Sequence, residues 1–457
     1  MTEIPTDLQK RLKAHGQEHV LYGWNELSVI QRTNLVTQLS TLNFRELDEL
    51  IAKAKVVEPP PKSQVIAPLS VASGEATANE RSLGEEALRR GEVAALIVAG
   101  GQGSRLGFDK PKGMFPVGPV SGASLFQIHA EKLLATSRRY GKPVLFLVMT
   151  SPATDTETRD YFRENQFFGL PESDVIFFEQ GTMPAVCAYT GRLLLDDYGT
   201  LALSPNGHGG TITALAERCI FRELHTRGVK HIYYFQVDNP LLKLCDPGFI
   251  GRHISTQSEA SSKVVFKERP EEKVGVFALI DGKCGMIEYS DLPRELSEVR
   301  ESTGELRFRA GNPAIHLFAV NFLEQITSGD GLPYHIARKA ISHFDPEAGV
   351  TVTPSSELNG LKFERFIFDA LPLAERWLAV ETSRAEEFSP LKNGSGADSP
   401  ETVRAAQSAL HSGWLERAGV PTHGHTVEIS PLFALDEAEL KRKLPSGFTV
   451  TGPTLLR

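Results

Sequence analysis

The fold class predicted from this sequence rests on the stretch Val93 to Gly107, VAALIVAGGQGSRLG. Its first residues, Val93 to Val98, are all apolar, which is typical of a parallel strand buried on both faces. The strand ends at Gly100 and Gly101, and glycines there let backbone N–H groups approach a phosphate chain without a clash from Cβ. The stretch therefore predicts a buried strand followed by a loop suited to an anionic ligand.

Apolar runs and helical patterns alternate outward from this stretch. Strands are predicted at 93–98, 144–149, 174–179 and 231–237, and helices at 82–91, 123–139, 155–166 and 211–227. This alternation predicts an α/β domain with a mainly parallel sheet. Ligands of such sheets bind at the carboxyl ends of the strands. The site is therefore expected in the loops that follow Val98, Met149, Phe178 and Val237.

The flanking segments have different patterns. Before the sheet, Ser28 with Gln31 and Asn43 with Glu46 predict helix-capping boxes, and the proline-rich segment 58–80 predicts a linker or a surface strap.

After the sheet the pattern favours strands. Those expected are 263–267, 274–280, 286–289, 313–320, 426–429 and 448–450, with a hairpin turn at Asp281–Gly282 and a short helix at 401–410.

Composition excludes several classes of protein. The chain has 457 residues, 41% of them hydrophobic, and a net charge of −8, with no basic run that would indicate a nucleic-acid partner. Its four cysteines form no C-x-x-C pair, which predicts reduced thiols and a cytoplasmic location. No apolar run of about 18 residues predicts a membrane span, and the first residues have no apolar signal core. The oligomeric state stays open between a monomer and a weak dimer.

Two cations follow the glycines of the loop. Arg105 can bind a phosphate through two parallel hydrogen bonds, and Lys112 supplies a mobile point charge. A P-loop would need Gly-Lys-Ser/Thr, which is absent. A dinucleotide fingerprint that starts at Gly101 would need glycine at position 106, which is Leu106. The sequence therefore matches neither motif, and the missing dinucleotide fingerprint argues against an NAD-dependent dehydrogenase.

GGQGSRLG followed by Pro111-Lys112-Gly113 resembles the signature of the eukaryotic-type UDP-sugar pyrophosphorylases, and within that family it is most similar to the UDP-N-acetylglucosamine pyrophosphorylases. Further blocks match in the same order along nearly the whole chain. They are MTS at 149–151, FEQ at 178–180, PNGHGG at 205–210, VDN at 237–239, VGV at 274–276, IEY at 287–289, AGN at 310–312, GLKFE at 360–364 and FSPLKN at 388–393.

The resemblance implies a glycosyltransferase-A-like (Rossmann-like) fold with a mixed, mainly parallel sheet flanked by helices. The domains expected are a helical N-terminal region at 1–57, a linker and helix at 58–90, a catalytic α/β nucleotide-sugar domain at 91–395, and a small C-terminal α+β region at 396–457. The activity implied is the transfer of a uridylyl group from UTP to a sugar 1-phosphate, with Mg²⁺ or Mn²⁺ as the cofactor.

The resemblance also implies roles for individual residues. Nucleotide contacts are expected from Ala99, Gly100, Gly101, Gly103, Gln180, Gly207, Asp238 and Lys362; catalytic roles from Arg105, Lys112 and Lys392; and sugar contacts from His208, Glu288, Tyr289, Asn312 and Phe368. The Gln180 amide can both donate to and accept from uracil. Asp238 ends an apolar strand, as a metal-binding aspartate would, although Asp-Asn-Pro is also a turn signal.

The sequence departs from the family pattern at His208, where the N-acetylglucosamine enzymes have asparagine. The histidine is either a tolerated substitution in a glycine loop or a change in the sugar accepted. Glucose 1-phosphate and galactose 1-phosphate are therefore kept as alternative substrates. A sugar-nucleotide-binding protein without catalysis is a further alternative, although it would be expected to lack Arg105, Lys112 or Asp238.

Overall fold

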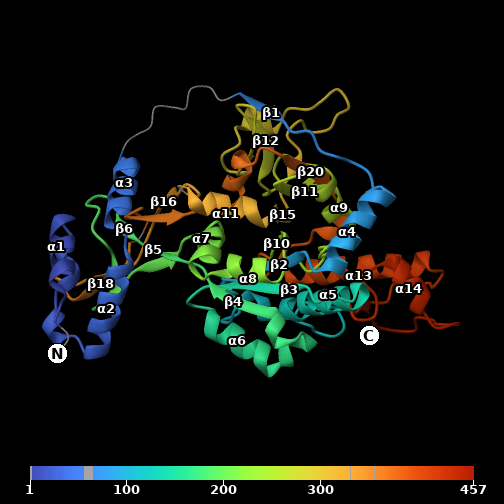
Figure 1. Ribbon diagram of the computed structural model, residues 1–457, viewed down its shortest axis with the longest axis horizontal. Coiled ribbons are helices and arrows are strands. Elements are labelled where there is room, and N and C mark those ends of the chain that lie inside the picture. Colours follow the sequence, from blue (N-terminus) through green and yellow to red (C-terminus); the bar gives the residue numbers. More distant parts are fainter. Residues whose placement is uncertain (1–2, 56–64, 330, 355) are drawn as a thin grey trace. The chain divides into compact units, whose positions relative to one another are not determined.

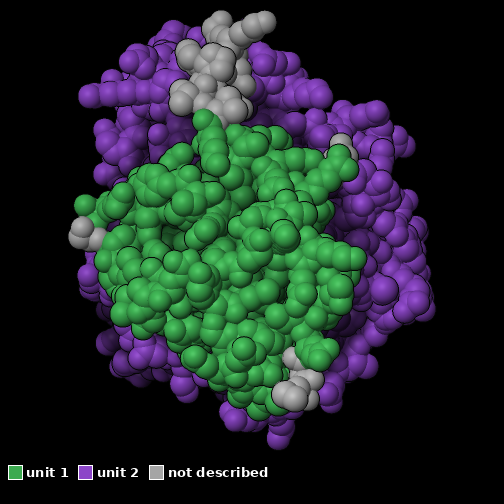
Figure 2. Space-filling view, turned by 90° about the vertical axis from the view of Figure 1, so that its left-hand side faces the viewer, with its two compact units in different colours: residues 1–64, 181–210, 332–367 green, residues 65–180, 211–331, 368–457 purple. Residues whose placement is uncertain are grey.

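The computed structural model describes residues 3–55, 65–329, 331–354 and 356–457 (Figure 1). The chain forms two compact units that interleave in the sequence and are coloured separately in Figure 2. Unit 1 comprises Met1–Gln64, Gly181–Gly210 and Leu332–Ile367, and unit 2 comprises Val65–Gln180, Thr211–Gly331 and Phe368–Arg457. Each unit has its own hydrophobic core.

The described residues of unit 1 form three α-helices and several short strands. The helices are α1 (Thr6–Ala14), α2 (Val29–Thr41) and α3 (Phe44–Lys55); the strands are β5 (Thr182–Pro184), β6 (Val186–Cys187), β7 (Leu195–Asp197), β8 (Thr200–Leu201), β9 (Leu203–Pro205), β16 (His335–Lys339), β17 (His343–Asp345), β18 (Val350–Val352) and β19 (Gly360–Glu364). The apolar faces of the helices pack on the strands, with Leu12, Leu35 and Phe363 fully buried in one core.

Unit 2 contains one large sheet and most of the helices. Its strands are β1 (Ile66–Pro68), β2 (Val93–Val98), β3 (Leu145–Thr150), β4 (Val175–Glu179), β10 (His231–Gln236), β11 (Ala260–Phe266), β12 (Val276–Ile280), β13 (Lys283–Ile287), β14 (Ala310–Gly311), β15 (His316–Ala319), β20 (Trp377–Glu381), β21 (Val427–Ile429) and β22 (Thr454–Leu456). Its helices are α4 (Ala78–Arg90), α5 (Leu125–Tyr140), α6 (Asp155–Glu164), α7 (Gly210–Glu217, whose first residue belongs to unit 1), α8 (Ile220–Thr226), α9 (Pro247–Ser255), α10 (Arg294–Ser297), α11 (Val320–Ser328), α12 (Arg384–Glu387), α13 (Pro400–Arg417) and α14 (Glu437–Lys443).

The large sheet is mixed, which confirms the predicted fold class. Its strand order is β1-β12-β14-β11-β15-β10-β2-β3-β4, with β13 beside β12 and β20 beside β11. Strands β10, β2, β3 and β4 are parallel, as the alternation of apolar runs and helices predicted. The strands on the other side of β10 pair antiparallel, apart from β20, which is parallel to β11. The parallel half places the ends of four strands at one edge.

Helices cover the parallel half on the face to which Val93, Ala95 and Ile97 of β2 point. These side chains are buried in one core with residues of α4, α5 and α9. Helices α4 and α9 approach closely because glycines stand where they meet: a Cβ at Gly84 would lie 1.9 Å from the Pro247 carbonyl oxygen, and one at Gly251 would lie 1.6 Å from that of Glu80. No helix among the described residues is both long and apolar enough to span a bilayer.

Several local predictions are confirmed. Ser28 forms the predicted capping box with Gln31 at the start of α2. Asn43 accepts from the Glu46 backbone, which is one half of the second predicted box. The hairpin between β12 and β13 turns at Asp281 and Gly282, which have φ values of 50° and 80° as a tight hairpin turn requires.

The prediction of one helix over 211–227 is wrong, because two helices occupy this segment. Cys219, at a φ of 55°, separates α7 from α8. A left-handed residue interrupts a right-handed helix.

Two predictions near the C-terminus are also wrong. Residues 448–450 form no strand, and β21 pairs instead with β22 in parallel. Helix α13 continues to Arg417, seven residues beyond the predicted end, because Trp414 and Leu415 are buried against other parts of the C-terminal region.

The predicted linker at 58–80 lies partly outside the described residues. From residue 65 onward this segment is bound to the rest of unit 2, because β1 pairs with β12 and the backbone of Ala72 forms hydrogen bonds with that of Ala379 and Glu381.

Four histidines of unit 2 lie in surroundings that favour the neutral ring: His129 and His253 are buried, and His231 and His411 are partly buried. Burial lowers the pKa of His129, His253 and His411 to about 3 and that of His231 to about 4. In the unfolded chain a histidine titrates near pH 6.5, within about one unit. Between these values the unfolded chain binds protons that the folded protein does not, so stability is lost as the pH falls from about 6.5.

We expect the free energy of unfolding to fall between pH 7 and pH 5, by up to about 1.4 kcal/mol per pH unit for each histidine. Urea unfolding at half-unit pH steps measures this slope. His231→Phe removes one such group, so its slope should be shallower than that of the parent protein. A stability that stays constant from pH 7 to pH 5 would contradict the burial of these neutral histidines.

Candidate functional site

The glycine loop after β2 folds back on itself. The backbone N–H of Gly103 donates to the carbonyl of Lys110 at 2.9 Å, and that of Lys112 donates to the carbonyl of Gly101 at 3.0 Å. Gln102 and Pro111 form an isolated bridge between these two bonds. The return of the chain therefore places Lys112 beside Gly101, at the end of the strand.

The loop meets the end of β10 through an ion pair. Val98 is the register partner of Gln236, so Asp238 follows β10 at the same edge of the sheet. Lys112 Nζ lies 3.0 Å from Asp238 Oδ2, and these side chains are 18% and 13% exposed. The predicted phosphate-binding lysine and the predicted metal-binding aspartate thus form one charged group that solvent can reach.

A second contact joins the loop to the ends of β3 and β4. Ser151 Oγ donates to the Gly100 carbonyl at 2.8 Å. The Gln180 side chain, from the end of β4, is 8% exposed, and a Cβ at Gly100 would lie 2.7 Å from its Nε2. A side chain at position 100 would therefore displace the Gln180 amide from this place.

The segment around Lys392 also lies against the loop. A Cβ at Gly394 would be 3.4 Å from the Arg105 carbonyl oxygen, and the Leu391 N–H donates to the Asp238 carbonyl at 2.8 Å. Arg105 is exposed and Lys392 is half-buried. The three predicted catalytic cations therefore come from two segments that pack together.

Two of the predicted sugar-binding residues, Glu288 and Asn312, lie further along the same sheet. Ile287 and Gly311 are both partners of Val276, so Glu288 and Asn312 follow the two strands that flank β12, at the same position along it. The Asn312 side chain accepts from the Ala314 N–H at 2.8 Å, which holds its amide in place. Tyr289 is 50% exposed, and Phe368 is buried at 6%. Strands β11, β15 and β10 separate β14 from β2 in the sheet order.

Three predicted residues belong to unit 1: Gly207, His208 and Lys362. Gly207 has a φ of 82°, and a Cβ there would lie 2.4 Å from the Arg365 carbonyl oxygen, so both conformation and space require glycine. His208 Nδ1 accepts from the Ile367 N–H at 3.2 Å, which leaves the proton of a neutral ring on Nε2. Lys362 is half-buried on β19.

The site offers a divalent cation one carboxylate. Among the described residues, no group of three His, Cys, Asp or Glu side chains could hold a metal by itself. Mg²⁺ commonly binds through one or two carboxylates together with substrate phosphates. Asp238, partly exposed at the strand edge, fits that class of site and does not fit a metal cage formed by the protein alone.

Sequence reasoning missed two residues that shape the site. Ser151 holds the Gly100 carbonyl, and Asn239, 3% exposed, connects the end of β10 to the segment before Lys392. Both lie in blocks that carry the resemblance, but a buried amide whose partners are far away in the sequence leaves no local pattern.

Comparison with known proteins agrees with this geometry. The profile of a family described as UTP–glucose-1-phosphate uridylyltransferase matches residues 40–406. The UDP-N-acetylglucosamine pyrophosphorylase of Saccharomyces cerevisiae is 36% identical over 451 residues, covering 93% of this chain and 94% of the relative. UDP-N-acetylglucosamine diphosphorylase 1 of Arabidopsis thaliana is 35% identical, covering 93% and 88%. The crystal structure of the uridine diphosphate N-acetylglucosamine pyrophosphorylase from Trypanosoma brucei, in complex with an inhibitor, has a TM-score of 0.82 at 28% identity, covering 100% of this chain and 98% of that one.

The packing of the glycine loop gives a stability prediction. A Cβ at Gly113 would lie 2.2 Å from the ring of Phe126, which is fully buried. We expect Gly113→Ala to lower the free energy of unfolding by about 1–3 kcal/mol, as overpacking does. Gly101→Ala is the matched control, because no atom lies within 4 Å of a Cβ there. Urea unfolding compares the two, and equal stability would show that the loop does not pack as described.

Proposed function

Because this chain belongs to the UTP–glucose-1-phosphate uridylyltransferase family, we propose that it transfers the uridylyl group of UTP to a sugar 1-phosphate and releases pyrophosphate. The acceptor we propose is N-acetylglucosamine 1-phosphate, because the relatives with the matching blocks are named for that sugar.

One observation carries the proposal: the Lys112–Asp238 ion pair at the ends of β2 and β10. Nucleotidyl transfer needs a cation at the reacting phosphates and a carboxylate for the metal that accompanies them. The fold supplies both, the cation from the loop that follows β2 and the carboxylate from the end of β10, with Nζ and Oδ2 3.0 Å apart. A sugar-nucleotide-binding protein would need neither group.

The reaction is an in-line substitution at phosphorus. A phosphate oxygen of the sugar 1-phosphate attacks the α-phosphorus of UTP, the bond from that phosphorus to the β-phosphate oxygen breaks, and pyrophosphate leaves with the bonding electrons. The protein contributes position and charge, because no covalent nucleophile is needed.

The cations divide the charge between them. Lys112 stabilises the α- and β-phosphates as negative charge develops on the leaving oxygen, and Arg105 contacts the triphosphate. Lys392 receives the phosphate of the acceptor sugar. Asp238 keeps the Lys112 ammonium at the strand edge until phosphate oxygens compete for it.

Asp238 is the residue that would hold Mg²⁺ or Mn²⁺ together with phosphate oxygens. Such an ion, when bound, neutralises charge on the pyrophosphate that leaves.

The remaining contacts orient the substrates. The Gln180 amide and the backbone of Ala99 to Gly101 and Gly103 hold the uridine end. Glu288, Tyr289 and Asn312 bind sugar hydroxyls, Phe368 lines the sugar side, and His208 takes the place at which the N-acetylglucosamine enzymes have asparagine.

We also propose that the protein acts in the cytoplasm. All four cysteines are free, as a reducing compartment requires.

The direct test is pyrophosphate release from UTP with Mg²⁺. N-acetylglucosamine 1-phosphate, glucose 1-phosphate and galactose 1-phosphate are offered separately. We expect release with N-acetylglucosamine 1-phosphate to exceed the other two, and removal of the metal with a chelator to abolish it. A preference for glucose 1-phosphate would replace the sugar in the proposal, and UTP binding without release from any sugar would support a binding protein.

Lys112→Ala tests the mechanism. We expect kcat to fall about 10²–10³-fold, the loss typical of one transition-state donor, while the Kd for UTP rises much less. Steady-state rates and calorimetric UTP binding measure the two effects. If binding and turnover fall by the same factor, Lys112 contributes to ground-state binding alone.

A further inference from the structure

The segment that leads to Lys392 has no regular structure of its own. Residues 388–393 belong to no helix or strand, so no ladder of backbone bonds fixes them. The side chain of Asn239, which lies about 150 residues earlier in the chain, bonds to the backbone where this segment begins, at Glu387, the last residue of α12, and at Ser389. Its Nδ2 donates to the Glu387 carbonyl at 2.7 Å, and its Oδ1 accepts from the Ser389 N–H at 3.1 Å. Both ends of this buried amide are thus used on one segment.

A third bond continues the same connection. The Leu391 N–H donates to the Asp238 carbonyl at 2.8 Å. Residues 238 and 239 therefore hold positions 387, 389 and 391 in succession, directly before Lys392. The residue that pairs with Lys112 is thus also a backbone partner of the segment that carries the last cation.

Glu387 anchors the near end of the segment. Its carboxylate is 3% exposed and accepts from Lys263 Nζ at 2.7 Å, from Thr382 Oγ1 at 2.5 Å and from the Lys243 N–H at 3.1 Å. Burial alone would lower the pKa of Lys263, but Asp246 and Glu387 together raise it above the usual value. The lysine therefore stays charged between two carboxylates.

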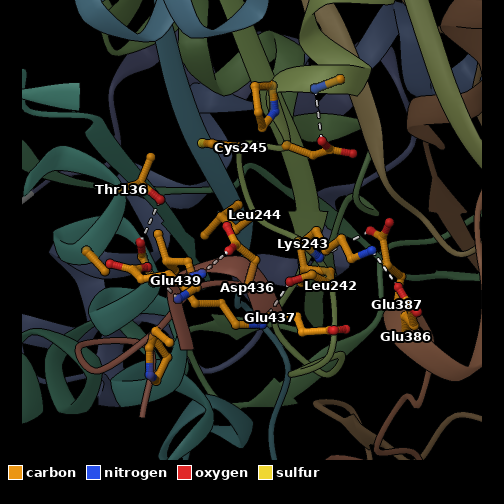
Figure 3. A pocket seen from close by; sticks show the side chains of 18 of the residues that line it. Thr136, Leu242, Lys243, Leu244, Cys245, Glu386, Glu387, Asp436, Glu437 and Glu439 are labelled. Carbon is orange, nitrogen blue, oxygen red and sulfur yellow. Dashed lines mark hydrogen bonds and ion pairs between the residues drawn. The ribbon is translucent and has the colours of Figure 1, made fainter. Parts of the chain in front are cut away.

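This anchor is not supported by apolar packing on every side. Lys243, Asp246, Lys263 and Glu387 all line a pocket of about 1170 Å³ in unit 2. Figure 3 shows Lys243, Glu386 and Glu387 along one side of it. Buried ion pairs contribute little net stability, and their best-attested use is to select one arrangement over others. Here the Lys263–Glu387 ion pair holds the Glu387 side chain in one position.

We propose that Asn239 is a positioning residue for Lys392, and that the buried Lys263–Glu387 pair holds the segment on which Asn239 acts. The inference rests on the proposed function, because the contact of Lys392 with the acceptor phosphate belongs to it. Asn239 is buried, and both ends of its amide bond to the backbone of residues 387 and 389. The amide keeps residues 387–391 against the end of β10, so that Gly394, two residues after Lys392, lies against the glycine loop at Arg105.

The test is a double-mutant cycle between Asn239→Ala and Lys392→Ala. We expect Asn239→Ala to lower kcat/KM for the sugar 1-phosphate about 10–100-fold, as misplacement of a catalytic group does, while the KM for UTP changes less than about three-fold. In the Lys392→Ala protein the same change should cost less than about three-fold more, because coupled residues are not additive. Glu386→Gln is the matched control: its carboxylate neighbours Glu387 in sequence but pairs only with the exposed Lys243 ammonium among the described residues.

A second readout does not need activity. Loss of the Asn239 amide should speed hydrogen–deuterium exchange in peptides that cover 387–392 by about five-fold or more, the effect of one lost hydrogen bond. Thr382→Val, which removes one bond to Glu387, should speed it less, and Glu386→Gln should leave it unchanged. If Asn239→Ala does not fold, Thr382→Val in the two Lys392 backgrounds takes its place in the cycle.

The outcomes separate the two proposals. Equal losses with and without Lys392, or unchanged exchange in Asn239→Ala, would overturn the positioning role and leave the proposed function intact. A parent protein that releases no pyrophosphate from any sugar 1-phosphate, with exchange that still depends on Asn239, would overturn the proposed function and leave Asn239 as the residue that fixes the segment.

Discussion

The register between β2 and β10 is the constraint on which the candidate site depends. Parallel pairing of Val98 with Gln236 brings the glycine loop and Asp238 to one edge of the sheet, although more than 130 residues of chain separate Val98 from Gln236. A shift of one residue in this register would turn the side chains of β10 to the opposite face. Four parallel strands that end together account for three contacts. They are the Lys112–Asp238 ion pair, the hydrogen bond from Ser151 to the Gly100 carbonyl, and the position of the Gln180 amide beside Gly100.

Glycines at the site are required by close approach more often than by unusual backbone angles. Gly100, Gly113 and Gly207 each face an atom that a Cβ would meet within 2.7 Å, and of these three only Gly207 has a positive φ. The loop is therefore a packed element, held between the Gln180 amide and the Phe126 ring. Such a loop holds its backbone N–H groups in fixed positions. The loss of conformational entropy that ordering the loop requires therefore occurs on folding and not on ligand binding.

A second layer of polar contacts supports the charged groups. Asn239 bonds to the backbone of the segment that carries Lys392, while Lys263, Thr382 and Lys243 hold the carboxylate of Glu387 at the start of that segment. Cations that act on phosphates need positions fixed within a fraction of an ångström, and long lysine side chains do not supply that by themselves. A buried hydrogen-bond network that holds the backbone in one position restricts where these lysine side chains begin.

The sequence by itself determined the parallel strands, the glycine loop with its two cations and the family blocks, because apolar runs, glycine spacing and motif order are local properties of the chain. It misplaced the break at Cys219, the end of α13 at Arg417, and the C-terminal strand, which is β22 and not 448–450. Only the tertiary structure brought Asp238 to Lys112 and Asn239 to the segment before Lys392. The physical reason is that burial and hydrogen bonding between segments more than 100 residues apart depend on where the whole sheet places them, and the sequence around either partner carries no trace of the other.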